Sequence, residues 1–165
     1  MSDDISDLTN RVALRLEAER VNWRKGFDGI AADLKSKFAK GGAFGDSVYR
    51  QEMHQLCAGE LHRRSILTVD ALLSEHKNMS ESPRDAVTAG CKDWLAQRIA
   101  EEATELARHL GPGAGDLGES CKTETERVSS HVDSYMGQLR RERTERGIRR
   151  ATRVLAWLRK VLGLS

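Results

Sequence analysis

The sequence has little proline, little cysteine and no long apolar run. Only two prolines occur in 165 residues, and the apolar residues are regularly spaced, which argues against a disordered chain despite 32% charged residues. The three cysteines are odd in number and far apart, which excludes a disulfide-dense secreted scaffold. No apolar stretch approaches the ~18 residues of a membrane-spanning helix.

The first ten residues, MSDDISDLTN, are acidic and lack the apolar region of a secretory signal. We therefore expect a cytoplasmic protein, which would be peripheral if it binds a membrane. The length suits one domain that can bury roughly 70% of its unfolded surface.

Apolar residues recur at steps of three and four, which predicts helices and no strands. Gly41-Gly42 and Gly111-Pro112 interrupt the pattern, Asp46 or Ser47 can cap a helix, and Ser82-Pro83 is a typical helix start. The predicted helices span about 5–38, 47–77, 82–110 and 119 to the C-terminus. The second has apolar residues on two opposite sides, which indicates burial between two neighbours.

This pattern predicts an all-α fold, an elongated bundle of three to four long helices with a basic amphipathic C-terminal helix. We expect residues 1–139 to form the bundle body, 140–147 a charged hinge and 148–165 a separable amphipathic helix. The length of the first helix suggests that part of its apolar stripe pairs with another copy, so a homo-oligomer or a helical protein partner is expected.

The formal net charge of +2 conceals two parts of opposite charge. Residues 138–165 carry nine basic and two acidic side chains, a net charge of +7, whereas the other residues carry 18 basic and 23 acidic side chains, a net charge of −5. This asymmetry indicates an anionic partner for the C-terminal part. The candidate anion-binding residues are Arg140, Arg141, Arg143, Arg146, Arg149, Arg150, Arg153, Arg159 and Lys160.

The C-terminal segment also has an apolar face, turned by about 120° from the preceding stripe if the helix is continuous. Most basic residues lie opposite this face, and Trp157 lies at its border. A leucine face, a cationic face and a border indole suit the water–lipid interface of an anionic membrane. The candidate membrane- or partner-binding residues are Ile148, Val154, Leu155, Trp157, Leu158, Val161 and Leu162.

Two other interpretations stay open. The apolar face could complete the bundle or lie in the groove of a partner protein. The Arg-rich segment 140–160 could bind nucleic acid, which is less favoured because residues such as Leu155 and Leu158 are more apolar than phosphate binding requires.

Residues for catalysis or metal binding are not evident. His54 and Cys57 share a helix face but would make at most half of a tetrahedral zinc site. The close acids Glu101, Glu102 and Glu105 are interpreted as a solvated helix face. We therefore expect a non-enzymatic interaction module with no catalytic residue, cofactor or metal, tethered to an anionic membrane surface by its C-terminal helix.

Overall fold

The computed structural model describes residues 2–43, 46–77, 85–111 and 115–161. The predicted start at Ser82-Pro83 lies outside these residues. All regular structure in the described part is helical, which confirms the predicted all-α bundle. The helices are α1 (Ser2–Lys40), α2 (Ser47–Lys77), α3 (Asp85–Ala107) and α4 (Gly118–Val161).

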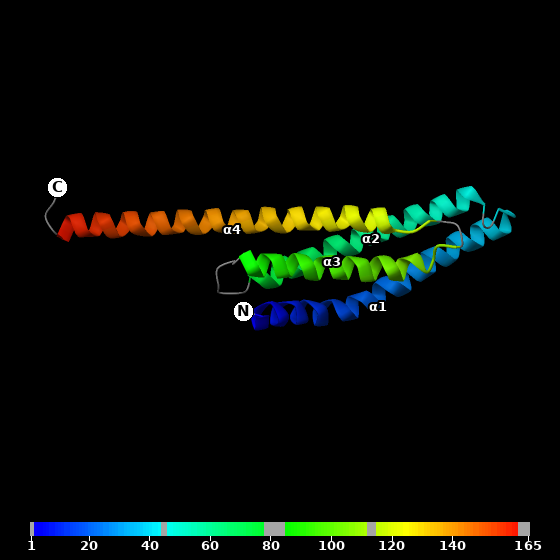
Figure 1. Ribbon diagram of the computed structural model, residues 1–165, viewed down its shortest axis with the longest axis horizontal. Helices are drawn as coiled ribbons and strands as arrows, with labels where there is room; N and C mark the ends of the chain where they lie inside the picture. The colour runs from blue at the N-terminus through cyan, green and yellow to red at the C-terminus, as the bar shows by residue number, and fades with distance from the viewer. Residues whose placement is uncertain (1, 44–45, 78–84, 112–114, 162–165) are drawn as a thin grey trace.

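Successive helices run antiparallel (Figure 1). In the described part of the chain, α2 and α3 each contact all three other helices, whereas α1 and α4 do not contact each other. The two central helices are therefore covered on more than one side. This arrangement explains the two apolar sides of α2, which the sequence predicted to lie between two neighbours.

The predicted apolar stripes form the core. Leu8, Val12, Leu61, Leu95 and Val132 are all completely buried. Each helix therefore contributes its stripe to one shared core. One residue of the first stripe departs from the pattern, because Ile30 is 54% exposed.

The α1–α2 connection is tight because its backbone groups are satisfied locally. Gly42 adopts a positive φ of 71°, its N–H donates to the carbonyl of Ala39, and the N–H of Ala43 donates to the carbonyl of Phe38. This is the Schellman pattern, which favours glycine at the left-handed position. The carboxylate of Asp46 accepts the N–H of Tyr49 at 2.7 Å, which confirms Asp46 as the predicted cap of α2.

The ends of the bundle are uneven (Figure 1). At one end, α1 and α2 extend together beyond α3 and the start of α4. At the other end, α4 continues alone past the N-terminus of α1. Residues 140–147 are helical and continue α4 without a break, so their role as a hinge stays a prediction.

Leucine-to-alanine substitutions at two sites test the assignment of the core. Leu61→Ala should lower the free energy of unfolding by about 2–5 kcal/mol, because it leaves a cavity at a completely buried position. Leu14→Ala is the matched control at a residue that is 78% exposed, and it should change stability by no more than about 0.5 kcal/mol. Urea unfolding measures both, and equal losses would contradict the packing described here.

Candidate functional site: the projecting half of α4 and a charged cleft

We call residues 140–161 the projecting half of α4. Among its apolar side chains, Ile148 is 60%, Val154 is 55% and Leu155 is 60% exposed. The interpretation that this face completes the chain's own bundle is therefore wrong for these three residues. Position 162 lies outside the described residues, and for Trp157, Leu158 and Val161 the structure describes the helical backbone alone.

The basic residues of the projecting half are also in contact with solvent. Residues 140–155 are all exposed, including seven of the nine predicted anion-binding residues. The two acids of this segment pair along the helix, Glu142 with Arg146 at 3.6 Å and Glu145 with Arg149 at 3.8 Å. Such exposed pairs contribute little stability, so an external anion can compete with Glu142 and Glu145 for these two arginines. For Arg159 and Lys160 only the helical backbone is described.

The continuity of α4 fixes the direction of its exposed apolar face. Val128, Val132 and Met136 are buried against the bundle, whereas Ile148 and Leu155 lie on a face turned by about 150° from them at 100° per residue. Ile148 and Leu155 therefore point away from the side on which the bundle lies.

A buried histidine lies where α4 leaves the bundle. His76, near the end of α2, is 4% exposed and its ring lies edge-on to Tyr135 at a centroid distance of 6.0 Å. The hydroxyl of Tyr135 donates to the carbonyl of Leu73 at 3.3 Å. Burial, with a smaller effect from the positive charge of Arg143, lowers the pKa of His76. This contact fixes α4 to α2 next to the projecting half.

Inside the body, three carboxylates surround a buried arginine. Arg64 of α2 is 1% exposed, and its guanidinium donates to Glu60 at 2.8 Å, to Glu102 at 2.7 Å and to Glu105 at 2.9 Å. Burial alone would lower the pKa of Arg64, but these three hydrogen bonds raise it above its ordinary value. The guanidinium also lies 5.9 Å from the centre of the Phe27 ring. The positive charge of Arg64 therefore links α1, α2 and α3.

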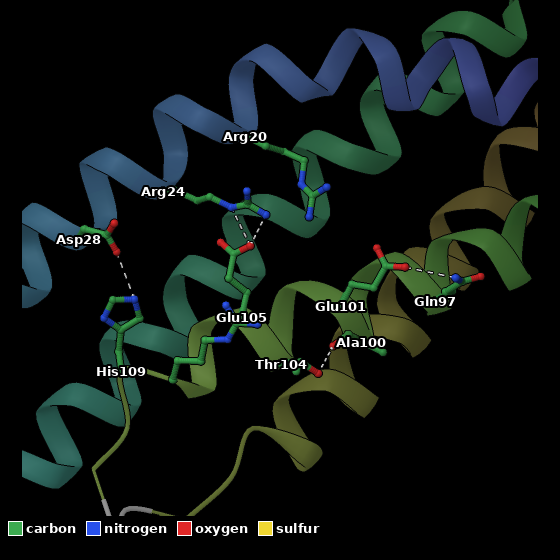
Figure 2. Close-up of a pocket in the computed structure, with 10 residues that line it drawn as sticks. Arg20, Arg24, Asp28, Gln97, Ala100, Glu101, Thr104, Glu105 and His109 are labelled. Atoms are coloured by element: carbon green, nitrogen blue, oxygen red, sulfur yellow. Dashed lines mark hydrogen bonds and ion pairs between the residues drawn. The ribbon is translucent and has the colours of Figure 1, made fainter.

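A polar cleft of about 820 Å³ opens between α1 and α3 beside this network. Figure 2 shows Arg24 of α1 and Glu105 of α3 pointing toward each other across it, with a hydrogen bond of 2.7 Å. Arg20 pairs with Glu102 at 2.7 Å, and His109 lies 3.2 Å from Asp28. The two helices are thus joined across the cleft by side chains of opposite charge.

The electrostatics of the cleft favour a structural role. Burial raises the pKa of Glu105, but hydrogen bonds from Arg24 and Arg64 outweigh burial and hold the pKa below its ordinary value. Burial lowers the pKa of His109, and the nearby carboxylate of Asp28 opposes this shift. At neutral pH, Glu105 is therefore ionised and its negative charge is compensated within the protein.

The interpretation of the α3 acids as a solvated face is wrong for two of them. Glu101 is exposed and pairs with Arg98 at 2.6 Å, as expected, but Glu102 is 6% exposed and Glu105 is half-buried. The sequence did contain a signal that Glu102 is buried. Glu102 continues the stripe of Leu95 and Ile99 at helical spacing, and Arg64 likewise continues the stripe of α2. A charge within an apolar stripe predicts a buried ion pair.

Two of the three cysteines, Cys57 and Cys91, are buried in the interior, whereas Cys121 is half-buried. Burial raises the pKa of Cys57 and of Cys91 to about 11, so both thiols are protonated at neutral pH. The thiol of Cys57 lies 3.6 Å from the carbonyl of Leu106, while Nε2 of His54 lies 3.0 Å from the carbonyl of Asp116. Among the described residues, no group of three or more His, Cys, Asp or Glu is placed to hold a metal.

Within the described ranges, no helix combines the length and the apolar composition that crossing a membrane requires. Comparisons with protein-family models, with curated proteins and with solved structures found no match to this chain. The projecting half of α4 leaves apolar and cationic side chains exposed on one helix, which makes it the candidate functional surface.

Substitution of adjacent arginines tests the buried charge network. Arg64→Met should lower the free energy of unfolding by about 3–5 kcal/mol, because it leaves Glu102 and Glu105 short of a buried partner. Arg63→Met is the matched control, since Arg63 also binds Glu60 but its side chain is 48% exposed, and it should cost about 1 kcal/mol or less. Similar losses for the two variants in urea unfolding would show that burial of Arg64 is unimportant.

The pH dependence of stability tests the site around His76. Burial lowers the pKa of His76 in the folded protein, so as pH falls the unfolded chain binds a proton at this residue first. The contribution of neutral His76 to folding stability is therefore complete above the ordinary pKa of 6.5 and is lost as pH falls from 6.5 toward the folded pKa. His76→Leu should flatten the fall in unfolding free energy between about pH 7 and pH 5, above the range in which carboxylates titrate. His131→Leu, at an exposed position, is the control. If the unfolding free energy of His76→Leu fell with pH as steeply as that of the unchanged chain, His76 would not be the source of the pH dependence.

Proposed function

We propose that this protein is a non-enzymatic helical module that self-associates and binds an anionic membrane surface through the projecting half of α4. The observation that supports this proposal is the joint exposure of Ile148, Val154 and Leu155 on a helical segment, residues 140–161, that carries nine basic and two acidic residues. Exposed apolar side chains in a continuous face are typical of a surface that is covered in the functional state.

The physical chemistry of this face suits a lipid interface. Each basic side chain near an anionic surface contributes about 1 kcal/mol, and the apolar face adds free energy in proportion to the area that it buries. The long arginine side chains can extend to the headgroups while their aliphatic stems stay near the apolar region. In the sequence, Trp157 lies at the border of the two faces, where an indole favours the interface.

The geometry allows this contact without unfolding the bundle. The projecting half extends past the other helices, so it can lie along a surface while the body keeps its core (Figure 1). Because it is an isolated helix about 30 Å long, it gains little from tertiary packing in the free protein. Binding at an interface would supply the missing burial for its apolar face.

Nucleic acid is a second candidate, because arginine is exposed at Arg141, Arg146, Arg149, Arg150 and Arg153. Binding through phosphate contacts alone would depend steeply on salt and would not require Ile148 or Leu155. A membrane contact needs both kinds of side chain. The two candidates therefore differ in the effect of changing the apolar residues.

Co-sedimentation with vesicles tests the proposal. Ile148→Glu plus Leu155→Glu in the full chain should abolish pelleting with vesicles that contain phosphatidylserine, because both apolar contacts are lost and two negative charges are added. Leu14→Glu plus Val21→Glu is the matched control, since both residues are exposed on α1 and the change in charge is the same. The control should pellet like the unchanged chain.

Both double variants should keep the unfolding midpoint of the unchanged chain, since all four positions are exposed. Equal pelleting of the two variants would contradict the membrane proposal. Binding of DNA or RNA that is unaffected by Ile148→Glu plus Leu155→Glu, without vesicle binding, would favour the nucleic-acid candidate.

A further inference from the structure

The bundle leaves a second surface uncovered, at the end opposite the projecting half. His109, after α3, packs edge-on to Phe27 of α1 at 5.0 Å, and the carbonyl of Asp116, before α4, lies 3.0 Å from His54 of α2. Beyond these contacts α1 and α2 continue as a helical hairpin (Figure 1). We call residues 30–40 of α1 and 47–56 of α2 the hairpin tip.

The hairpin tip contains an apolar groove. Ile30, Leu34 and Leu56 line a groove of about 720 Å³ between the two helices. Ile30 is 54% exposed, and the other two are half-buried. The groove lies on a side of α1 turned by about 130°, at 100° per residue, from Arg20, Arg24 and Asp28, which line the cleft toward α3. Among the described residues, no contact of α3 therefore covers it.

The charges on the groove favour a basic occupant. Asp33 and Glu52 line the groove, and neither carboxylate forms an ion pair with a described residue. The ammonium group of Lys37, which also lines the groove, lies 5.6 Å from the centre of the Phe38 ring. Negative charges therefore outnumber positive charges around an apolar floor. A helix with an apolar face and basic flanks matches this surface in both respects.

We infer that the groove of the hairpin tip is covered by the projecting half of α4 from a second copy of the chain. The occupant has the required chemistry, because Ile148 and Leu155 are exposed and Arg149 and Arg153 lie on the same helix. The lengths agree as well. Residues 30–40 of α1 span about 17 Å of helix, and residues 148–158 of α4 span the same length.

The contact closes into a dimer. The groove and the projecting half lie at opposite ends of the molecule (Figure 1). Two copies related by a two-fold axis therefore lie antiparallel, and each donates its projecting half to the groove of the other. At each of the two contacts, α1 and α2 of one copy and α4 of the other form a three-helix arrangement.

This inference rests on the proposed function, because the same apolar face binds either the groove or the membrane and cannot bind both at once. The dimer shelters Ile148 and Leu155 while the protein is in solution. An anionic membrane competes with the groove for the projecting half, so membrane binding and this dimer oppose each other by mass action.

Sedimentation of two complementary full-length variants tests the inference. The groove variant is Ile30→Arg plus Asp33→Arg, which places positive charge where Arg149 and Arg153 would lie. The tail variant is Ile148→Glu plus Leu155→Glu. Each variant alone should dimerise at least about tenfold more weakly than the unchanged chain, a loss of about 1.4 kcal/mol or more. Leu14→Arg plus Val21→Arg, also on exposed positions of α1, is the control and should dimerise normally.

A mixture of the two variants tests directly whether the groove of one copy binds the projecting half of another. The intact projecting half of the groove variant meets the intact groove of the tail variant, so the mixture should associate more tightly than either variant does alone. Dimers of the groove variant alone would indicate pairing between two projecting halves, and dimers of the tail variant alone would indicate pairing between two grooves. Either result, or a monomeric unchanged chain, overturns the inference.

The vesicle assay separates this inference from the proposed function. The groove variant keeps its projecting half, so it should bind phosphatidylserine vesicles at a lower lipid concentration than the unchanged chain. Equal or weaker vesicle binding by a monomeric groove variant would overturn the competition between dimer and membrane. Failure of the unchanged chain to bind vesicles, with the dimer intact, would contradict the proposed function alone.

Discussion

A helix can bury its apolar face only along the length over which it has neighbours, and the helices of this bundle differ in length. α4 has 44 residues, whereas α2 has 31 and α3 has 23. Because consecutive helices fold back on one another, the excess length emerges at the two ends, as the projecting half of α4 and the hairpin tip. Both surfaces on which we base functional proposals follow from this mismatch.

The body that presents these surfaces is held together by charge as well as by apolar packing. Arg64 places a full positive charge within the core, and two of its three carboxylate partners, Glu102 and Glu105, connect α2 to α3. A buried ion pair of this kind adds little net stability over an apolar core, but it strongly disfavours packings that leave either charge unpaired. The network therefore fixes how α1, α2 and α3 are aligned, and with it the position of the hairpin tip.

The sequence predicted the helices and their inward faces, because apolar spacing and caps such as Asp46 are local signals. It also predicted the amphipathic C-terminal segment. It did not predict that Ile30 would be exposed, since that depends on which sides of α1 the other helices cover. Nor did the burial of Glu102 follow from local charge spacing, because its partners Arg20 and Arg64 come from two other helices. Contacts between helices were thus the part that sequence patterns left open.

Hydrogen exchange tests the central claim, that the projecting half of α4 binds an anionic membrane. It is measured at a protein concentration at which the chain sediments as a monomer. With phosphatidylserine vesicles, the amides of residues 148–161 should exchange more slowly than with phosphatidylcholine vesicles, because the lipid stabilises an otherwise isolated helix. The amides of residues 118–139 should exchange alike with both. Equal exchange of residues 148–161 with the two lipids would contradict the account.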